Sequence, residues 1–233
     1  MPVIRLIKKL FKLLFVLLLF SVIYGFVCKW IMPPVTLTQI AHVADGYGLK
    51  KDYVRLGEIS DNAKLAVIAA EDQLFGLHKG FDWTSLGKSL QGENLKAGRA
   101  RGSAASTISQ QTAKNVFLWQ GSGIWKYLRK PLEFFYTWFI EMVWGKERIL
   151  EVYLNVIETG KGVFGFEAAA QKYFNKPAAK LTRREAAMIA ASLQNPKVYT
   201  IVPMSKHVQW KTGWILKQMN NIQNDRDIKQ LLK

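Results

Sequence analysis

A long apolar segment near the start of the chain constrains the fold more than any other feature. Residues 13–28 are apolar apart from Ser21, and further apolar residues extend the run on both sides. Lys12 and Lys29 lie at its ends, where their long side chains can reach a membrane surface. With these flanks the run approaches the roughly 20 residues that a helix needs to cross a bilayer. The segment therefore predicts one transmembrane helix within residues 1–32.

The charges that precede this segment predict its orientation. Four basic residues come before it without a single acid: Arg5, Lys8, Lys9 and Lys12. The positive-inside rule then places the N-terminus in the cytoplasm and everything after Pro34 outside.

A cleaved signal peptide is the alternative interpretation of the same segment. It is disfavoured because no small-x-small cleavage site follows the apolar run. Lipoprotein processing at Cys28 is disfavoured because Val27 is not a small residue. Cys28 is the only cysteine, so no intramolecular disulfide forms and the redox compartment cannot be read from cysteines.

Size and charge limit the partners. With 233 residues and a net charge of +16, the chain is one sizeable basic domain plus the anchor. Such an excess suits nucleic acid, an anionic membrane or a phosphorylated substrate. The predicted topology excludes nucleic acid, because the domain lies across the membrane from it. Membrane phospholipid and anionic, lipid-linked sugars remain, and most of the lysines are expected to form an ordinary solvated surface.

Local signals beyond the anchor predict a mainly α-helical domain. We interpret residues 33–60 as a linker leading into the domain and residues 61–233 as the domain itself. Ser60 and Asp61 form a helix N-cap signal, and Thr182-x-x-Glu185 is a capping box. No convincing alternating strand pattern is present. The expected helices cover residues 61–71, 83–95, 106–116, 132–151, 183–193 and 208–222, with a loop at 96–103.

The most informative local feature is a pair of carboxylates that ends an apolar helical run. Residues 63–70 are almost entirely apolar, and Glu71 and Asp72 follow them directly. Glu71 lies one turn after Val67 and Ile68, so it shares their apolar side. A carboxylate held against apolar surface keeps its proton more readily and can act as a general base near neutral pH.

The segment that begins at Glu71 also resembles a known signature. Residues 71–82 read Glu-Asp-x-x-Phe-x-x-His-x-Gly-x-Asp, which is similar to the first motif of the peptidoglycan glycosyltransferases, glycosyltransferase family 51. Four further blocks resemble that family's remaining motifs in the same order, so the resemblance covers roughly residues 45–200. These blocks are Ala104 to Gln111 with Lys114-Asn115, Arg129-Lys130-x-x-Glu133, Lys146 to Asn155, and Gly160 to Phe174. Ala104 stands where the family has a glycine, which costs something if that glycine needs a positive φ.

This resemblance implies a fold, a reaction and a cellular place. The fold is a lysozyme-like helical lobe beside a smaller jaw lobe that touches the membrane. The reaction polymerises lipid II into β-1,4-linked glycan strands and releases undecaprenyl pyrophosphate. The closest branch is the monofunctional biosynthetic one, anchored in the bacterial inner membrane with its domain in the periplasm. Its partners are lipid II, the growing lipid-linked glycan chain, membrane phospholipid and other proteins of cell-wall synthesis and division.

The resemblance also implies roles for individual residues. Glu71 deprotonates the acceptor sugar's 4-hydroxyl, and Glu133 orients cations or a divalent ion at the pyrophosphate. The resemblance makes no cofactor certain, and it leaves open a divalent cation, Mg²⁺ or Mn²⁺, at the pyrophosphate. Arg129 and Lys130 share a helical stripe with Glu133, and Lys114 and Lys146 are expected to converge on the same phosphates. The predicted substrate-binding residues are Asp72, Phe75, Ser106, Gln110, Gln111, Lys114, Asn115, Arg129, Lys130 and Lys146.

Plainer interpretations stand beside these roles. Glu133 and Arg129 form an ordinary helix ion pair in the plainest reading, and His78 is more simply a structural hydrogen-bonding residue. Asp72 and Asp82 are candidate caps. A second group is most simply core or satisfies backbone groups: Phe75, Tyr153, Asn155, Tyr173 and Phe174.

Two other functions and one further motif pattern are compatible with parts of the sequence. A lysozyme-like hydrolase that uses Glu71 as an acid has no pyrophosphate to neutralise, and a non-catalytic basic scaffold should tolerate the loss of Glu71. The triplets of penicillin-binding acylases occur at Ser85-x-x-Lys88, Ser60-Asp61-Asn62 and Lys211-Thr212-Gly213, but in the wrong order and on the wrong elements. We treat them as coincidence.

Overall fold

The computed structural model describes residues 2–84, 87, 106–121 and 123–232. By its contacts the chain divides into two compact units, Met1–Pro34 and Val35–Lys233. Each unit is described by itself. Most of the expected helix at 83–95, the loop at 96–103, and Ala104, Ser85 and Lys88 lie outside the described residues.

The first unit is one long helix, α1 (Pro2–Val27). Its stretch Ile4–Val27 is long and apolar enough to cross a membrane, and it is almost entirely unburied by protein. Exposed apolar side chains along most of a helix of this length suit lipid rather than water. The segment predicted as the membrane anchor is therefore a helix of suitable length and hydropathy.

The second unit is mainly helical, as expected. After α2 (Leu37–Ala44) its described elements follow in the order β1 (Lys50–Lys51), η1 (Leu56–Glu58), α3 (Asp61–Glu71), α5 (Ile108–Phe117), α6 (Ile124–Val143), α7 (Lys146–Val156), β2 (Glu158–Gly160), β3 (Val163–Phe164), α8 (Phe166–Phe174), η3 (Ala178–Lys180), α9 (Arg183–Ser192), α10 (Lys206–Ile222) and α11 (Arg226–Leu232). Residues 33–60, expected as a linker, contain α2, β1 and η1. The expected division into two lobes stays a prediction.

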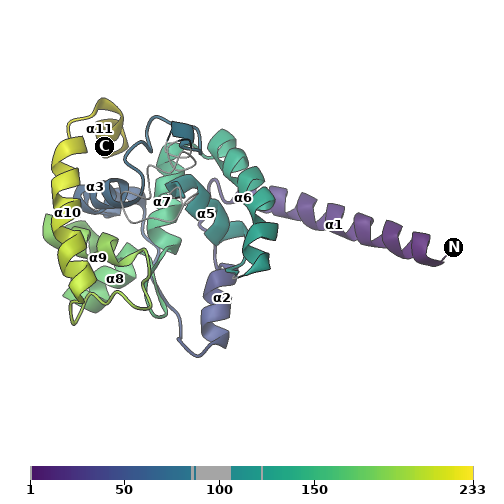
Figure 1. Ribbon diagram of the computed structural model, residues 1–233, viewed down its shortest axis with the longest axis horizontal. Helices are drawn as coiled ribbons and strands as arrows, with labels where there is room; N and C mark the ends of the chain where they lie inside the picture. The colour runs from purple at the N-terminus through teal and green to yellow at the C-terminus, as the bar shows by residue number, and fades with distance from the viewer. Residues whose placement is uncertain (1, 85–86, 88–105, 122, 233) are drawn as a thin grey trace. The chain divides into compact units, whose positions relative to one another are not determined.

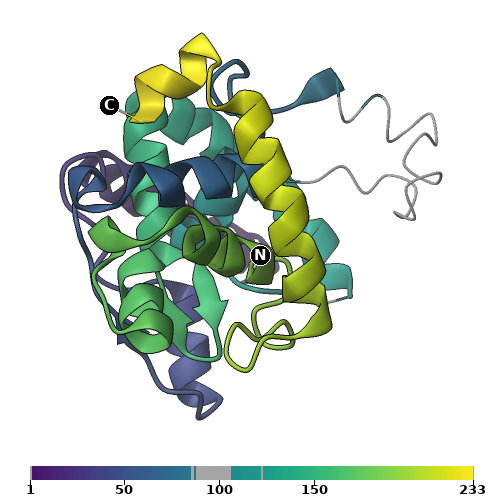
Figure 2. The same ribbon diagram turned by 90° about the vertical axis from the view of Figure 1, so that its left-hand side faces the viewer.

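Two groups of helices build the core. In one, α3 packs against α9 and α10; in the other, α5 packs against α6 and α7 (Figures 1 and 2). The inner residues of α3 from Ala63 to Ala69 are all buried, because its run of alanines lets neighbouring helices approach closely. This packing holds the C-terminal end of α3, which carries Glu71, inside the domain.

Side-chain caps begin several helices where the sequence predicted them. Ser60 accepts a hydrogen bond from the Ala63 amide at the start of α3. Thr182 and Glu185 form the predicted capping box of α9. Thr107 and Gln110 form another at the start of α5, two residues after the expected beginning of that helix. These caps satisfy amide groups that no residue within the helix can reach.

The expected single helix over residues 132–151 is wrong. The structure has α6, which begins earlier at Ile124 and runs through Pro131, and then α7 from Lys146. Gly145 separates them with φ of +78° and ψ of 167°, a backbone conformation that other residues rarely adopt. Residues 145–148 read Gly-Lys-Glu-Arg between two apolar runs, a pattern that periodicity alone does not distinguish from a polar turn of one helix.

The domain also contains a small sheet that the sequence pattern did not predict. Its strand order is β1-β3-β2, with β1 parallel and β2 antiparallel to β3. Strands of two or three residues are too short to show an alternating pattern. Gly162 lies in the turn before β3, where an added Cβ would lie 2.2 Å from the Tyr47 carbonyl oxygen. The sheet ties the segment after α2 to the segment after α7.

Candidate active site

Glu71 is the last residue of α3, where the apolar face formed by Val67 and Ile68 ends. Its Oε2 accepts a 2.8 Å hydrogen bond from Nε2 of Gln111, 40 residues further along the chain. Its Oε1 is buried and has no hydrogen-bond partner among the described residues. Burial raises the pKa of Glu71, while Gln111 and the charges of Lys211 and Lys114 oppose that rise. Glu71 therefore has the properties of a general base: a raised pKa and one unpaired oxygen.

The orientation of the Gln111 amide is set by Tyr153. The Tyr153 hydroxyl donates to Gln111 Oε1 at 3.1 Å, so the amide nitrogen faces Glu71. Burial raises the pKa of Tyr153 well above its ordinary value, and the nearby carboxylate of Glu71 adds to this effect. Tyr153 therefore stays protonated and remains a donor. Tyr153 is fully buried, as expected for a core residue, but it also positions the partner of Glu71.

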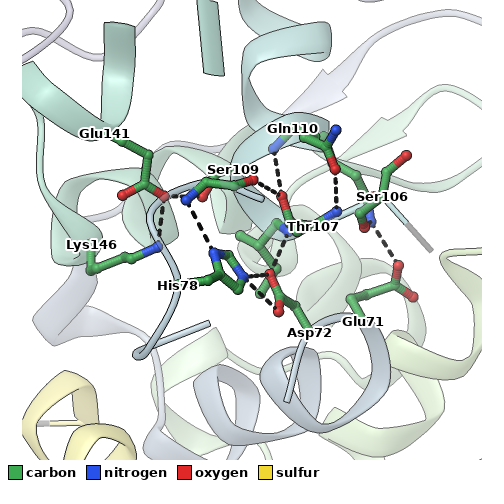
Figure 3. Close-up of polar contacts among 12 residues, drawn as sticks. Glu71, Asp72, His78, Ser106, Thr107, Ser109, Gln110, Glu141 and Lys146 are labelled. Carbon is green, nitrogen blue, oxygen red and sulfur yellow. Dashed lines mark hydrogen bonds and ion pairs between the residues drawn. The ribbon is translucent and has the colours of Figure 1, made fainter. Parts of the chain in front are cut away.

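Asp72 and His78 join the end of α3 to the start of α5 (Figure 3). Both carboxylate oxygens of Asp72 lie 2.9 Å from His78 Nε2, and Oδ2 also accepts from the Ile108 amide at 3.0 Å. The Gly80 amide donates to His78 Nδ1, which places the imidazole proton on Nε2, toward Asp72. His78 thus has the structural role that the sequence suggested. Asp72, His78 and the Ile108 amide form a clamp between α3 and α5, and this clamp brings Glu71 and Gln111 to face each other.

Gln110 and Ser106 lie beside this clamp. The Gln110 side chain accepts from the Thr107 amide at 3.0 Å, so it completes the α5 cap (Figure 3). The Thr107 hydroxyl donates to the Gly80 carbonyl at 2.7 Å. The Ser106 carbonyl accepts from Gln111 Nε2 at 3.2 Å. These residues, predicted to bind substrate, thus hold the start of α5 and the Gln111 side chain in place.

A cationic cluster lies on α6, as the spacing of its residues predicted. Lys130 Nζ is 2.7 Å from Glu133 Oε1, and Arg129 Nε is 3.5 Å from Glu133 Oε2. Arg129 also donates to the Trp119 carbonyl at 2.8 Å, which fixes its guanidinium. Arg129 and Glu133 are buried, whereas the Lys130 side chain is 46% exposed. The cluster, Arg129, Lys130 and Glu133, carries a net positive charge and suits an anionic group.

Lys114 connects this cluster with Glu71. It lies three residues after Gln111 on α5, so the two side chains share a face of that helix. Burial lowers the pKa of Lys114, and the carboxylate of Glu133 opposes that change, while Arg129 and Lys130 reinforce it. The negative charge of Glu71 also raises the pKa of Lys114, as that of Glu133 does. Lys114 therefore lies within electrostatic reach of both the base and the cationic cluster.

The structure does not bring Lys146 to that cluster. Its ammonium is 2.6 Å from Glu141 Oε1 and 4.5 Å from the centre of the Phe75 ring. Ser109 donates to the same Glu141 oxygen at 2.5 Å, so the network joins α5, α6 and the start of α7 (Figure 3). Phe75 is fully buried. The structure gives Lys146 and Phe75 these packing contacts, and the predicted convergence of Lys146 with Lys114 is not found.

Asn115 lines a cavity of about 410 Å³ together with Gln111 and Lys114. Its Oδ1 accepts from Gln120 at 3.2 Å, whereas its buried Nδ2 has no partner among the described residues. Asn115 thus has an unused donor, and its role in substrate binding stays a prediction.

The surroundings of Glu133 do not fit a divalent ion held by the protein. Within the described part of the chain no group of three or more His, Cys, Asp or Glu side chains is placed to bind a metal. Glu133 is one carboxylate among three cations, Arg129, Lys130 and Lys114, which would repel a metal ion. We derive no step through a metal.

One cation near Glu71 was missed. Lys211 on α10 is buried, lies 4.1 Å from the centre of the Trp214 ring, and lowers the pKa of Glu71 through its charge. It belongs to the triplet Lys211-Thr212-Gly213, which lies within a helix, as expected for a coincidental match. No local signal in the sequence relates α10 to the end of α3.

Comparisons with known proteins show the family of the chain. The family model described as Transglycosylase matches residues 37–220. A biosynthetic peptidoglycan transglycosylase of Aeromonas hydrophila is 44% identical over 225 residues, which cover 94% of this chain and 92% of that protein. A protein of the same name from Mannheimia succiniciproducens is 49% identical, covering 79% of this chain and 74% of the relative. One from Escherichia coli is 53% identical, covering 74% and 69%.

The fold and the site define a mainly helical domain in which Lys114 links the Glu71 carboxylate to a cationic cluster. The chain belongs to the transglycosylase family, so the predicted resemblance is confirmed. It is a glycosyltransferase.

Proposed function

We propose that this chain polymerises lipid II into β-1,4-linked glycan, with Glu71 as the general base. The observation that supports it is the placement of Glu71, whose unpaired oxygen is buried while Lys114 couples it to the cluster on α6. The relatives' names, biosynthetic peptidoglycan transglycosylase, support the choice of polymer.

The proposed reaction is a displacement at the anomeric carbon of the donor. Glu71 takes the proton of the acceptor's 4-hydroxyl as that oxygen forms its bond to the carbon. The bond from the carbon to the phosphate oxygen breaks, and its electron pair leaves with undecaprenyl pyrophosphate. Arg129, Lys130 and Lys114 stabilise the negative charge that develops on the departing phosphate, since preorganised cations act most strongly where charge develops.

The surface of α6 supports action at a membrane. Its exposed side chains include large apolar and aromatic residues that a soluble helix would rarely leave in water. They are Ile124, Trp125, Tyr127, Leu128, Trp138 and Met142. We propose that these side chains contact membrane phospholipid, that α1 anchors the chain in the bacterial inner membrane, and that the N-terminus is cytoplasmic and the domain periplasmic.

The first experiment measures the product made from lipid II. Purified full-length chain in detergent should convert lipid II into a ladder of glycan strands. Glu71→Gln keeps the size of the side chain but removes the base, so the rate should fall by about 10²–10⁴-fold. The matched control is Glu147→Gln, which changes an exposed carboxylate at the start of α7 and should leave the rate unaltered.

A hydrolase would give a different result. It would shorten preformed glycan and release no pyrophosphate from lipid II, because its reaction needs no such leaving group. Near-normal polymerisation by Glu71→Gln would instead remove Glu71 from the role of base.

A further inference from the structure

The cavity that Gln111 and Lys114 line is also lined by residues that the proposed chemistry does not use. They are His42 on α2, Glu158 at the start of β2, and Lys197 in the segment after α9. The cavity volume of about 410 Å³ lies in the range of about 300–1,000 Å³ typical of small-molecule sites. It is far larger than the roughly 30 Å³ that one water molecule occupies.

Three buried polar atoms of this cavity's lining residues have no hydrogen-bond partner in the described part of the chain. They are His42 Nδ1, Asn115 Nδ2 and Glu158 Oε1. His42 and Asn115 are each only 4% exposed. Buried polar groups in folded proteins are nearly always hydrogen-bonded, so three such atoms around one cavity indicate a site that awaits polar groups.

His42 and Glu158 do not satisfy each other. His42 Nδ1 and Glu158 Oε1 are 3.4 Å apart without the geometry of a hydrogen bond. Burial lowers the pKa of His42. The positive charge of Lys197 lowers it further, and the negative charge of Asp45 opposes this change. Burial raises the pKa of Glu158 to about 7, against the effect of Lys197. At neutral pH the imidazole is uncharged, so the pair offers hydrogen bonds rather than a closed ion pair.

The position of the cavity relates it to the donor substrate. Gln111 borders the cavity and also bonds Glu71, while Lys114 borders it and is coupled to the cationic cluster. The sugar that carries the pyrophosphate must lie between the base and those cations. The cavity therefore receives substituents of that sugar.

We propose that this cavity is a subsite for an amide group of the donor, bound by Asn115, His42 and Glu158. An amide offers one acceptor and one donor, which match the Asn115 Nδ2–H and the Glu158 oxygen. Lipid II carries amides in two places, the acetamido groups of its sugars and its peptide. The inference rests on the proposed function.

Kinetics with altered substrates test the subsite. Asn115→Asp keeps the shape and the bond from Gln120 but loses the donor, and Glu158→Leu loses the acceptor. Each should raise KM for lipid II about 3- to 10-fold, the worth of one neutral hydrogen bond, with a smaller change in kcat. Glu158→Gln keeps an acceptor and should recover part of the loss. Glu147→Leu, on an exposed carboxylate, should have no effect.

A second substrate shows whether the peptide amide or the acetamido group of lipid II occupies the cavity. If Glu158→Leu no longer raises KM for lipid-linked disaccharide without its peptide, the peptide amide occupies the cavity; if the rise persists, the acetamido group does. Unchanged KM in Asn115→Asp and Glu158→Leu, with wild-type polymerisation intact, would overturn the subsite. Should Glu158→Leu fail to fold, Asn115→Asp and Glu158→Gln carry the same comparison.

A binding measurement separates this inference from the proposed function. The chain has three histidines, so a ¹⁵N-histidine NMR spectrum is simple, and His42→Gln assigns one signal. Adding N-acetylmuramyl-alanine should shift the His42 signal and leave that of His207, which stacks on Tyr199 of another segment, in place. A wild-type chain that shows this shift but makes no polymer would refute the proposed function alone. An unmoved His42 signal at saturating fragment would refute the subsite.

Discussion

At the scale of single residues, the candidate site depends on the Glu71 carboxylate, whose pKa is raised by some of its surroundings and lowered by others. Burial raises the pKa of Glu71, and the Gln111 hydrogen bond and two lysines limit that rise. A base needs such a balance, because a pKa near the working pH allows it to be ionised before the reaction and to accept a proton during it.

Gln111→Met should move the acidic limb of the kcat/KM profile to higher pH. Gln111 donates to the Glu71 carboxylate and so lowers its pKa. Without this bond the pKa of Glu71 rises, and the pH at which kcat/KM reaches half its maximum should increase by about one unit, the equivalent of about 1.4 kcal/mol. The neighbouring change Gln110→Met alters only the α5 cap and should leave that pH in place. An identical profile for both variants would argue against Gln111 as the partner of the base.

Glu71→Gln should change how stability depends on pH. Because the folded pKa is raised, the folded chain binds more protons than the unfolded chain at pH values between the two pKa values. Stability of the wild type therefore falls as pH rises through that window, by up to about 1.4 kcal/mol per pH unit. Glu71→Gln lacks this loss, so its stability relative to wild type should increase between pH 5 and pH 8. Chemical denaturation at both pH values measures it, and parallel curves would contradict a buried, ionising Glu71.

At the scale of elements, helix ends place the site. The end of α3 supplies Glu71 and Asp72, and the start of α5 supplies Thr107 and the Ile108 amide that Asp72 binds. The break before α7 places Lys146 at the start of α7, where its ammonium meets Glu141 of α6. Each of these ends needs a cap or a special backbone conformation.

Gly145→Ala tests the break between α6 and α7. Gly145 has φ of +78° and ψ of 167°, where a Cβ brings strain whatever the space around it. The substitution should lower the free energy of unfolding by about 1–3 kcal/mol. Gly213→Ala is the matched control: it lies inside α10 with no atom within 4 Å of an added Cβ. It should stabilise the chain by about 0.5–1 kcal/mol. Thermal unfolding compares the two, and equal effects would contradict the conformational explanation.

At the scale of the whole molecule, anchoring and chemistry lie in separate units. The helix that suits a membrane lies in Met1–Pro34, and every residue of the candidate site lies in Val35–Lys233. The family match begins at residue 37, within the second unit.

A chain that starts at Val35 should be more soluble and should still polymerise lipid II in detergent, because no site residue is lost. On lipid II held in vesicles it should work more slowly, since the anchor no longer concentrates the enzyme at the membrane. Rates in micelles and in vesicles, compared with those of the full chain, measure the difference. An equal loss of activity in micelles would make the anchor part of the site.

Features that depend on neighbours within a few turns were readable from the sequence. The capping box at Thr182, the cap at Ser60 and the stripe of Arg129, Lys130 and Glu133 follow from the helical repeat, and the anchor follows from hydropathy. The resemblance of five blocks added the family, which the comparisons confirm.

Only the tertiary structure decided which distant groups meet. It pairs Glu71 with Gln111, Gln111 with Tyr153, and Lys146 with Glu141, and it brings His42 and Asn115 to the lining of one cavity. The physical reason is that a helix relates only residues three or four positions apart, whereas the approach of two helices depends on how their whole faces pack. The pKa of Glu71 depends on that packing too, because burial by other elements, and not the local sequence, is its largest cause.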